Sequence, residues 1–166
     1  MAVGERRSEV RPAPTAGMAT STAGLRGRID RSPATLGFVV GDLLLIGAFL
    51  VAGDINHGGS PLEQVGAFAG TAIPFYVGWL LAFPLAGVYA ARTRRSPRAA
   101  VTRTVAAWTG AVAVGLALRA TAVFPGGFAV TFMLVALLVG LALLLPFHLL
   151  PFVPRALTRL RGRVGA

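Results

Sequence analysis

Residues 65–91 read VGAFAGTAIPFYVGWLLAFPLAGVYAA and contain no charged side chain. About 20 mostly apolar residues are enough for a helix to cross the roughly 30 Å hydrocarbon core of a bilayer. This run is therefore long enough to form a transmembrane helix. Three further apolar runs occupy residues 36–53, 104–124 and 127–150, so the sequence predicts four membrane spans.

The overall composition also favours a membrane protein. Of the 166 residues, 55% are hydrophobic and only 13% are charged, and the mean hydropathy is +0.71. A soluble domain carries about 25% charged residues, so this chain lacks the polar side chains to cover a soluble globule. The predicted fold class is an all-α integral membrane bundle, and the length fits a single domain.

The basic residues predict how the chain is threaded. All sixteen are arginine, against six acidic residues, and the net charge is +10. The arginines concentrate before residue 36, in the connection around 92–103 and after residue 150, whereas the connections at 54–64 and 125–126 have none. Because cytoplasmic loops carry an excess of Lys and Arg, we expect a multi-pass protein of the cell membrane with both termini in the cytoplasm. This distribution favours topology over nucleic-acid binding, and we expect no nucleic-acid partner.

Two basic tails flank the predicted four-helix domain at residues 36–150. Residues 1–35 are rich in Ala, Gly, Pro, Ser, Thr and Arg and have almost no large apolar side chain, so we expect disorder. Residues 151–166 form a second basic cytoplasmic tail, as either a short interfacial helix or a frayed end. Both tails could contact anionic lipid headgroups, although a solvated tail that only sets topology is the simpler interpretation.

Asp42 interrupts the first span, where a carboxylate at membrane depth costs about 2.5–3.5 kcal/mol on insertion scales. At 1.5 Å per residue, it lies about 9 Å from Leu36, on the cytoplasmic side. Asp42 could be a proton relay or an ion ligand, but a helix–helix contact is the interpretation we favour. The inner half of the bundle offers no charged partner for it in the sequence.

Arg119 is the second anomaly, because it lies about 24 Å beyond Arg103 along the third span and so near the outer edge. An upright pair with Asp42 is therefore geometrically poor. We expect an outer cluster of Arg119 with the loop residues Asp54, His57 or Glu63. The alternative is that Arg119 extends into the outer headgroups.

No catalytic constellation accompanies these residues. His57 and His148 are predicted near opposite faces, so they cannot share a metal ion, and cysteine is absent. The sequence has no nucleophile elbow, phosphate-binding loop or zinc-protease motif. We therefore predict a protein that is not an enzyme and that needs no metal or cofactor.

Small residues indicate how the helices could pack. Gly37 and Gly41 in the first span, and Gly66 and Gly70 in the second, have the GxxxG spacing that lets membrane helices approach closely. We take these four glycines as candidate packing positions.

Several segments together resemble the domain of unknown function 3054 family, small archaeal and bacterial membrane proteins. The segments are GDLLLIGAF at 41–49, Gly53 with His57, PFYVGW at 74–79, SPRAAVTRT at 96–104 and LRATAVFPGGF at 118–128. The resemblance covers about residues 36–150 and implies a four-helix membrane protein. It implies no activity.

These observations favour an uncharacterised, non-enzymatic membrane protein, an accessory or structural subunit that packs with itself or with a partner in the bilayer. The alternative is a small oligomeric permease or channel that uses Asp42, Arg119 or both. An intramembrane enzyme is the third class, but the sequence lacks a nucleophile paired with a base.

Overall fold

The computed structural model of this chain describes residues 29–124, 126–154 and 157–158. Within these ranges the protein is all-helical, and this confirms the predicted fold class. The long helices are α2 (Pro33–Asn56), α3 (Val65–Ala86), α4 (Pro97–Arg119) and α5 (Val130–Leu149), with short 3-10 turns η1 (Thr93–Arg95) and η2 (Leu150–Phe152). All four are long and apolar enough to cross a membrane. The predictions for residues 1–28, and those for most of the tail after residue 154, lie outside the described residues.

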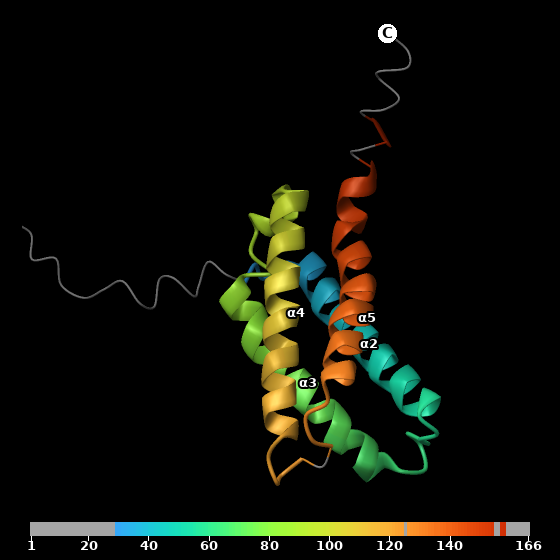
Figure 1. Cartoon of the computed structure of the whole chain (residues 1–166). Coiled ribbons are helices and arrows are strands. Elements are labelled where there is room, and N and C mark those ends of the chain that lie inside the picture. Colours follow the sequence, from blue (N-terminus) through green and yellow to red (C-terminus); the bar gives the residue numbers. More distant parts are fainter. Residues whose placement is uncertain (1–28, 125, 155–156, 159–166) are drawn as a thin grey trace, which may run out of the picture.

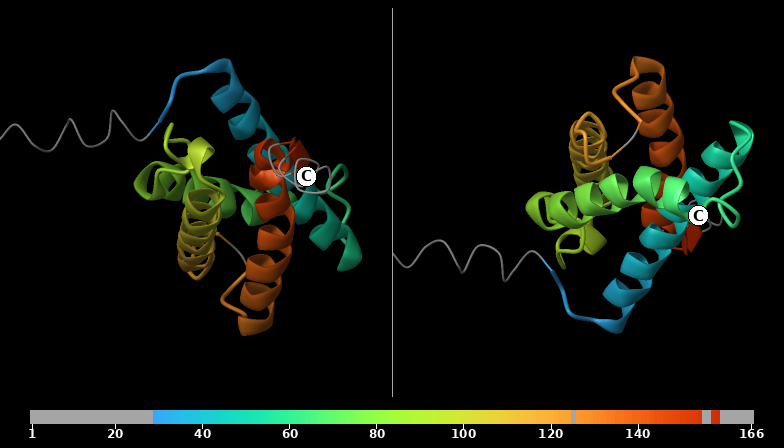
Figure 2. Two further views of the ribbon diagram at one scale, coloured as in Figure 1. Left: turned by 90° about the horizontal axis from the view of Figure 1, so that it is seen from above. Right: turned by 90° about the horizontal axis from the view of Figure 1, so that it is seen from below.

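The four helices run alternately up and down, so that each end of the bundle has its own set of connections (Figure 1). One end, called here the terminal end, holds the start of α2, the α3–α4 connection and the end of α5. The other, the loop end, holds the α2–α3 and α4–α5 loops. The predicted antiparallel neighbours α4 and α5 lie side by side, whereas α2 and α3 are strongly inclined to α4 (Figure 2).

Capping residues decide where two helices begin. Ser32 and Ser96 each precede a proline, and each hydroxyl accepts a hydrogen bond from a backbone N–H three residues later, at 3.3 Å. Serine at the N-cap followed by proline at the first helical position is a strong start signal. Helix α4 therefore starts at Pro97 rather than at the predicted residue 104, and it includes Arg98 and Arg103. Helix α2 likewise exceeds the predicted 36–53 at both ends.

Helix α3 stops earlier than its apolar run suggests. Gly87 adopts a left-handed backbone with φ of 68°, and its N–H donates to the Phe83 carbonyl at 3.0 Å. A left-handed glycine is a common helix terminator, because it has no Cβ to clash there. The helix thus ends at Ala86, not at Ala91, and Val88, Tyr89 and Ala90 fold back into the protein with 2–3% of their surface exposed.

The core is built where small residues allow α3 and α4 to meet closely. Gly78 of α3 lies directly against the backbone of Ala111, and a side chain at Gly78 would collide with that carbonyl. Trp79 and Trp108 are fully buried beside this contact, with ring centroids 6.2 Å apart. The Trp108 indole fits against Gly140 of α5 and donates to the Ala136 carbonyl at 2.9 Å. Small residues thus fix the α3–α4–α5 core.

The glycines predicted for close packing behave differently from one another. A Cβ placed on Gly37 or Gly66 would meet nothing within 4 Å, so neither mediates a close contact within the chain. Gly41 does lie against another helix, since the Phe147 ring of α5 occupies the space that a side chain would need. Gly70 is partly buried. The spacing alone could not distinguish glycines that face a neighbour from those on the bundle surface.

Candidate functional site

Asp42 is the centre of a buried polar cluster towards the terminal end. Its side chain is fully buried, and both carboxyl oxygens lie 3.0–3.1 Å from Nε2 of His148. The Tyr89 hydroxyl donates to Oδ2 of the same carboxyl group at 2.5 Å. One proton, carried by Nε2 or by the carboxyl group, is enough to make the Asp42–His148 contact a hydrogen bond.

Three separate parts of the chain bring this cluster together. Asp42 comes from α2, His148 from the last turn of α5, and Tyr89 from the segment that Gly87 turns back into the bundle. Phe38, one turn before Asp42, stacks on the His148 ring with centroids 5.3 Å apart and 24° between planes. The cluster therefore joins α2, α5 and the α3–α4 connection at one point.

Tyr89 is held in its donor form. Burial, followed by the adjacent Asp42 carboxylate, raises the pKa of the Tyr89 phenol well above its ordinary value. The group stays protonated at all physiological pH values, so its hydrogen bond to Asp42 persists. Asp42 thus has two hydrogen-bonding partners in the inner half of the bundle, Tyr89 and His148, which the sequence did not assign to it.

A second layer of polar contacts surrounds this cluster. Arg94 forms an ion pair with Asp30 and donates to the hydroxyls of Ser32 at 2.8 Å and Thr35 at 2.6 Å. These bonds fasten the segment before α2 to the α3–α4 connection. On α4, Arg103 donates to the Gly87 carbonyl at 3.0 Å and to the Thr93 hydroxyl at 2.8 Å, which supports the turn that positions Tyr89.

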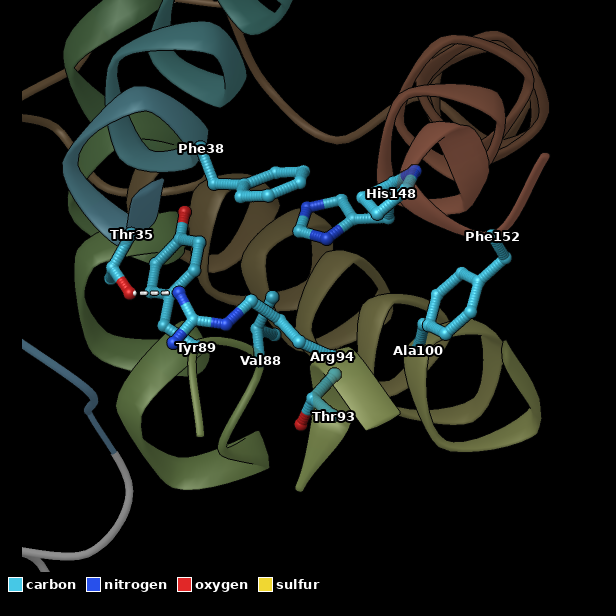
Figure 3. A pocket seen from close by; sticks show the side chains of 10 residues that line it. Thr35, Phe38, Val88, Tyr89, Thr93, Arg94, Ala100, His148 and Phe152 are labelled. Carbon is cyan, nitrogen blue, oxygen red and sulfur yellow. Dashed lines mark hydrogen bonds between the residues drawn. The ribbon is translucent and has the colours of Figure 1, made fainter. Parts of the chain in front are cut away.

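A small cavity adjoins His148 and Tyr89, with Phe38, Arg94 and Phe152 also on its walls (Figure 3). Its volume is about 20 Å³. A cavity of roughly 10–15 Å³ holds one water molecule, so this space fits a water and no larger substrate. The geometry of the terminal end is that of a buried polar contact between helices.

The loop end holds a much larger cavity, of about 430 Å³, called here the loop-end cavity. It lies between the last turns of α2 and the first turns of α5. Its walls are formed by Phe49, Leu50, Gly53, Asp54, His57, Thr71, Arg119, Ala129, Thr131, Phe132 and Val135.

Arg119 enters this cavity without a hydrogen-bond partner among the described residues. Its Nε and Nη1 atoms are buried and make no hydrogen bond to a described residue. Its guanidinium carbon lies 5.2 Å from the centre of the Phe132 ring. The Gly126 backbone, with φ of 146°, leaves the room that the guanidinium occupies, since any side chain there would collide with it. The last residue of α4 therefore turns into the protein.

The predicted outer cluster is only partly formed. Asp54 and His57 line the same cavity as Arg119, as the depth argument expects, but neither makes an ion pair with it. Asp54 directs its carboxylate at Gly59 of its own turn. Glu63 is exposed in the α2–α3 loop and does not line the cavity. Among the described residues Arg119 thus shares a cavity with Asp54 and His57 without an ion pair, because Asp54 faces its own turn.

Sequence reasoning did not identify His148 and Tyr89 as partners of Asp42. The depth argument placed Asp42 and His148 at the same face, and that shared depth was the available signal. Tyr89 had no comparable signal, because its position depends on the early end of α3. In the part of the chain that the structure describes, no three His, Cys, Asp or Glu side chains are grouped as a metal site requires.

Comparison with known proteins agrees with the resemblance seen in the sequence. The model of a family described as "Protein of unknown function (DUF3054)" matches residues 39–150. No curated protein and no solved structure matches the chain.

Proposed function

We propose that this chain, which belongs to the DUF3054 family, is a non-enzymatic integral membrane protein that serves as an accessory or structural subunit. It packs with itself or with another membrane protein. The observation that carries this proposal is the Asp42 cluster, in which both carboxyl oxygens are occupied by His148 and one also by Tyr89. The cavity beside His148 and Tyr89 has room for a single water, so the cluster is suited to joining helices rather than to chemistry.

The helix surfaces support the same proposal. Large apolar side chains are exposed along α2, α3 and α5, including Leu44 at 68%, Leu85 at 67% and Leu138 at 69%. Such surfaces fit lipid chains or the helices of a neighbour, since a soluble monomer rarely exposes large contiguous apolar patches. At Gly37 and Gly66 an added Cβ would meet nothing within 4 Å among the described residues, so both leave room on this surface for a second helix to approach.

The subunit role is tested by purifying the tagged full chain in a mild neutral detergent and measuring the mass of the protein–detergent complex. We expect a homo-oligomer or a defined partner. A strictly monomeric chain that co-purifies with no other membrane protein would sink the proposal.

The orientation of the subunit is part of the proposal: both termini and the α3–α4 connection face the cytoplasm, and the loop end faces outward. The chain has no cysteine, so a single introduced cysteine gives a labelling signal without background. A membrane-impermeant maleimide added to intact cells should label Ser60→Cys in the α2–α3 loop. Arg92→Cys in the α3–α4 connection should react only after permeabilisation. The reverse pattern would invert the orientation.

The alternative of a small oligomeric permease or channel draws on Arg119, whose buried guanidinium nitrogens lack partners. Vesicles reconstituted with the protein should then conduct protons or ions faster than empty vesicles. Flux that equals that of empty vesicles, and that Asp42→Asn leaves unchanged, removes the basis for transport and favours the subunit role.

A further inference from the structure

We propose that the loop-end cavity binds an anionic amphiphile, a molecule with a carboxylate or phosphate group and an apolar body. Arg119 holds the acid group, and the apolar body lies along Phe49, Phe132 and Val135. This inference goes beyond the subunit role, because a structural subunit needs no ligand at this place.

The first step of the argument is the state of Arg119. A guanidinium has five N–H donors in a planar fork that matches carboxylate and phosphate groups. Here Nε and Nη1 are removed from solvent and have no acceptor among the described residues. A buried charged group without hydrogen bonds is costly, so an acceptor supplied by a ligand would be bound strongly.

The second step is the shape and lining of the cavity. Ligand cavities typically measure about 300–1,000 Å³, and they are mostly apolar with a few converging polar groups. This one measures about 430 Å³, within that range. Its apolar walls come from α2 and α5, while Thr71 and Thr131 add hydroxyl groups. A small inorganic anion would leave most of this apolar space unfilled.

The third step concerns the charges around Arg119. Asp54 is the one carboxylate that lines the cavity, and it points at Gly59 of its own turn. His57 lines the exposed mouth. Phe132 contacts the guanidinium through its aromatic ring, with the guanidinium carbon 5.2 Å from the ring centre, and supplies no carboxylate or other acid group. The cavity therefore favours an anion over a cation or a neutral amphiphile.

The binding test uses the full chain in a neutral detergent and native mass spectrometry. The probes are dodecyl phosphate, its uncharged counterpart dodecanol, and inorganic phosphate. We expect one dodecyl phosphate per chain, with dodecanol and inorganic phosphate bound at least tenfold more weakly. If dodecanol bound as tightly as dodecyl phosphate, the requirement for an anionic group would be wrong. If inorganic phosphate bound as tightly, the requirement for an apolar body would be wrong.

Two variants assign the binding to this cavity. Arg119→Gln should weaken dodecyl phosphate binding about 10- to 100-fold, the range that corresponds to a lost charged hydrogen bond. The matched control Arg92→Gln removes an exposed arginine at the terminal end and should leave the affinity unchanged. Val135→Phe enlarges a side chain on the cavity wall and keeps the charge, so it should also weaken binding. Wild-type affinity in Arg119→Gln or in Val135→Phe would overturn the site.

The same acid group can belong to a membrane lipid or to a free amphiphile. Phosphatidylglycerol added in the same detergent distinguishes them. If it displaces dodecyl phosphate from the wild-type chain, the source is a bilayer lipid that enters between α2 and α5; if it does not, the source is a free single-chain acid. Both outcomes support the site, provided that Arg119→Gln removes the binding.

Discussion

Asp42 and Arg119 are both ionisable groups in apolar helices, yet the protein treats them in opposite ways. Asp42 is fully buried and receives contacts from His148 and Tyr89. Arg119 also turns inward, but two of its nitrogens are buried without a partner beside a cavity of about 430 Å³. A buried polar group is stable only when its hydrogen bonds are made. The difference therefore separates a polar group that completes the fold from one that is available to a ligand.

Removing the carboxyl group of Asp42 should have the largest effect. Asp42→Ala leaves the Tyr89 hydroxyl and the His148 ring buried without their acceptor, so the free energy of unfolding should fall by about 3–5 kcal/mol. Titration with a denaturing detergent in mixed micelles measures the change. The matched control is Asp54→Ala, which removes the other carboxylate of α2. That group is partly exposed and makes no ion pair, so the change should stay below about 0.5 kcal/mol. If Asp42→Ala and Asp54→Ala lowered the free energy of unfolding equally, the proposed contrast between the terminal end and the loop end would be wrong.

The contribution of a single donor to the Asp42 cluster comes next. Tyr89→Phe removes the 2.5 Å hydrogen bond to the carboxyl group, and we expect a loss of about 1.5–3 kcal/mol in the same assay. Tyr76→Phe is the control, since its hydroxyl donates to the neutral Leu43 carbonyl at 3.1 Å in a less buried place. Its loss should be about 0.5–1.5 kcal/mol. A Tyr89→Phe protein as stable as the wild type would show that His148 alone satisfies Asp42.

The smallest effect is expected at Arg119. In the absence of ligand, Arg119→Met should change the free energy of unfolding by less than about 0.5 kcal/mol or should stabilise the protein, because it removes a partly desolvated charge that has no acceptor. Arg103→Met, on the same helix, is the control. Arg103 donates to two acceptors, at 2.8 and 3.0 Å, so its loss should cost about 1.5–3 kcal/mol. If Arg119→Met proves as destabilising as Arg103→Met, Arg119 is structural.

The sequence predicts the four helices well, because each apolar run is bounded by charges or by loop residues. It predicts the helix ends less well, since bounding each span by its charged residues ignores two local signals. These are the Ser96-Pro97 start of α4 and the left-handed Gly87 that ends α3. Helix α4 accommodates Arg98 and Arg103 near its start, where Arg103 finds acceptors in the neighbouring turn. The apolar character of a segment therefore did not mark the true helix boundary.

The partners within the site were not predicted from the sequence. Depth along the helices placed Asp42 on the cytoplasmic side without a partner, and Arg119 level with Asp54. Which side chains touch depends on how the helices rotate about their axes and on the turn after α3, and a single sequence does not specify either. Arg119 was expected in a cluster with Asp54, His57 or Glu63, whereas the structure shows Asp54 turned towards Gly59.

The partners of Asp42 are synthesised well after Asp42 itself. Tyr89 follows Asp42 by 47 residues, and His148 follows it by 106. At about 5–20 residues per second, the ribosome needs roughly 5–20 s to add the residues between Asp42 and His148. The first helix therefore exists for seconds with an incompletely paired carboxyl group, and the last turn of the last helix supplies its remaining partner. A chain that ends before α5 therefore keeps an incompletely paired carboxyl group in α2.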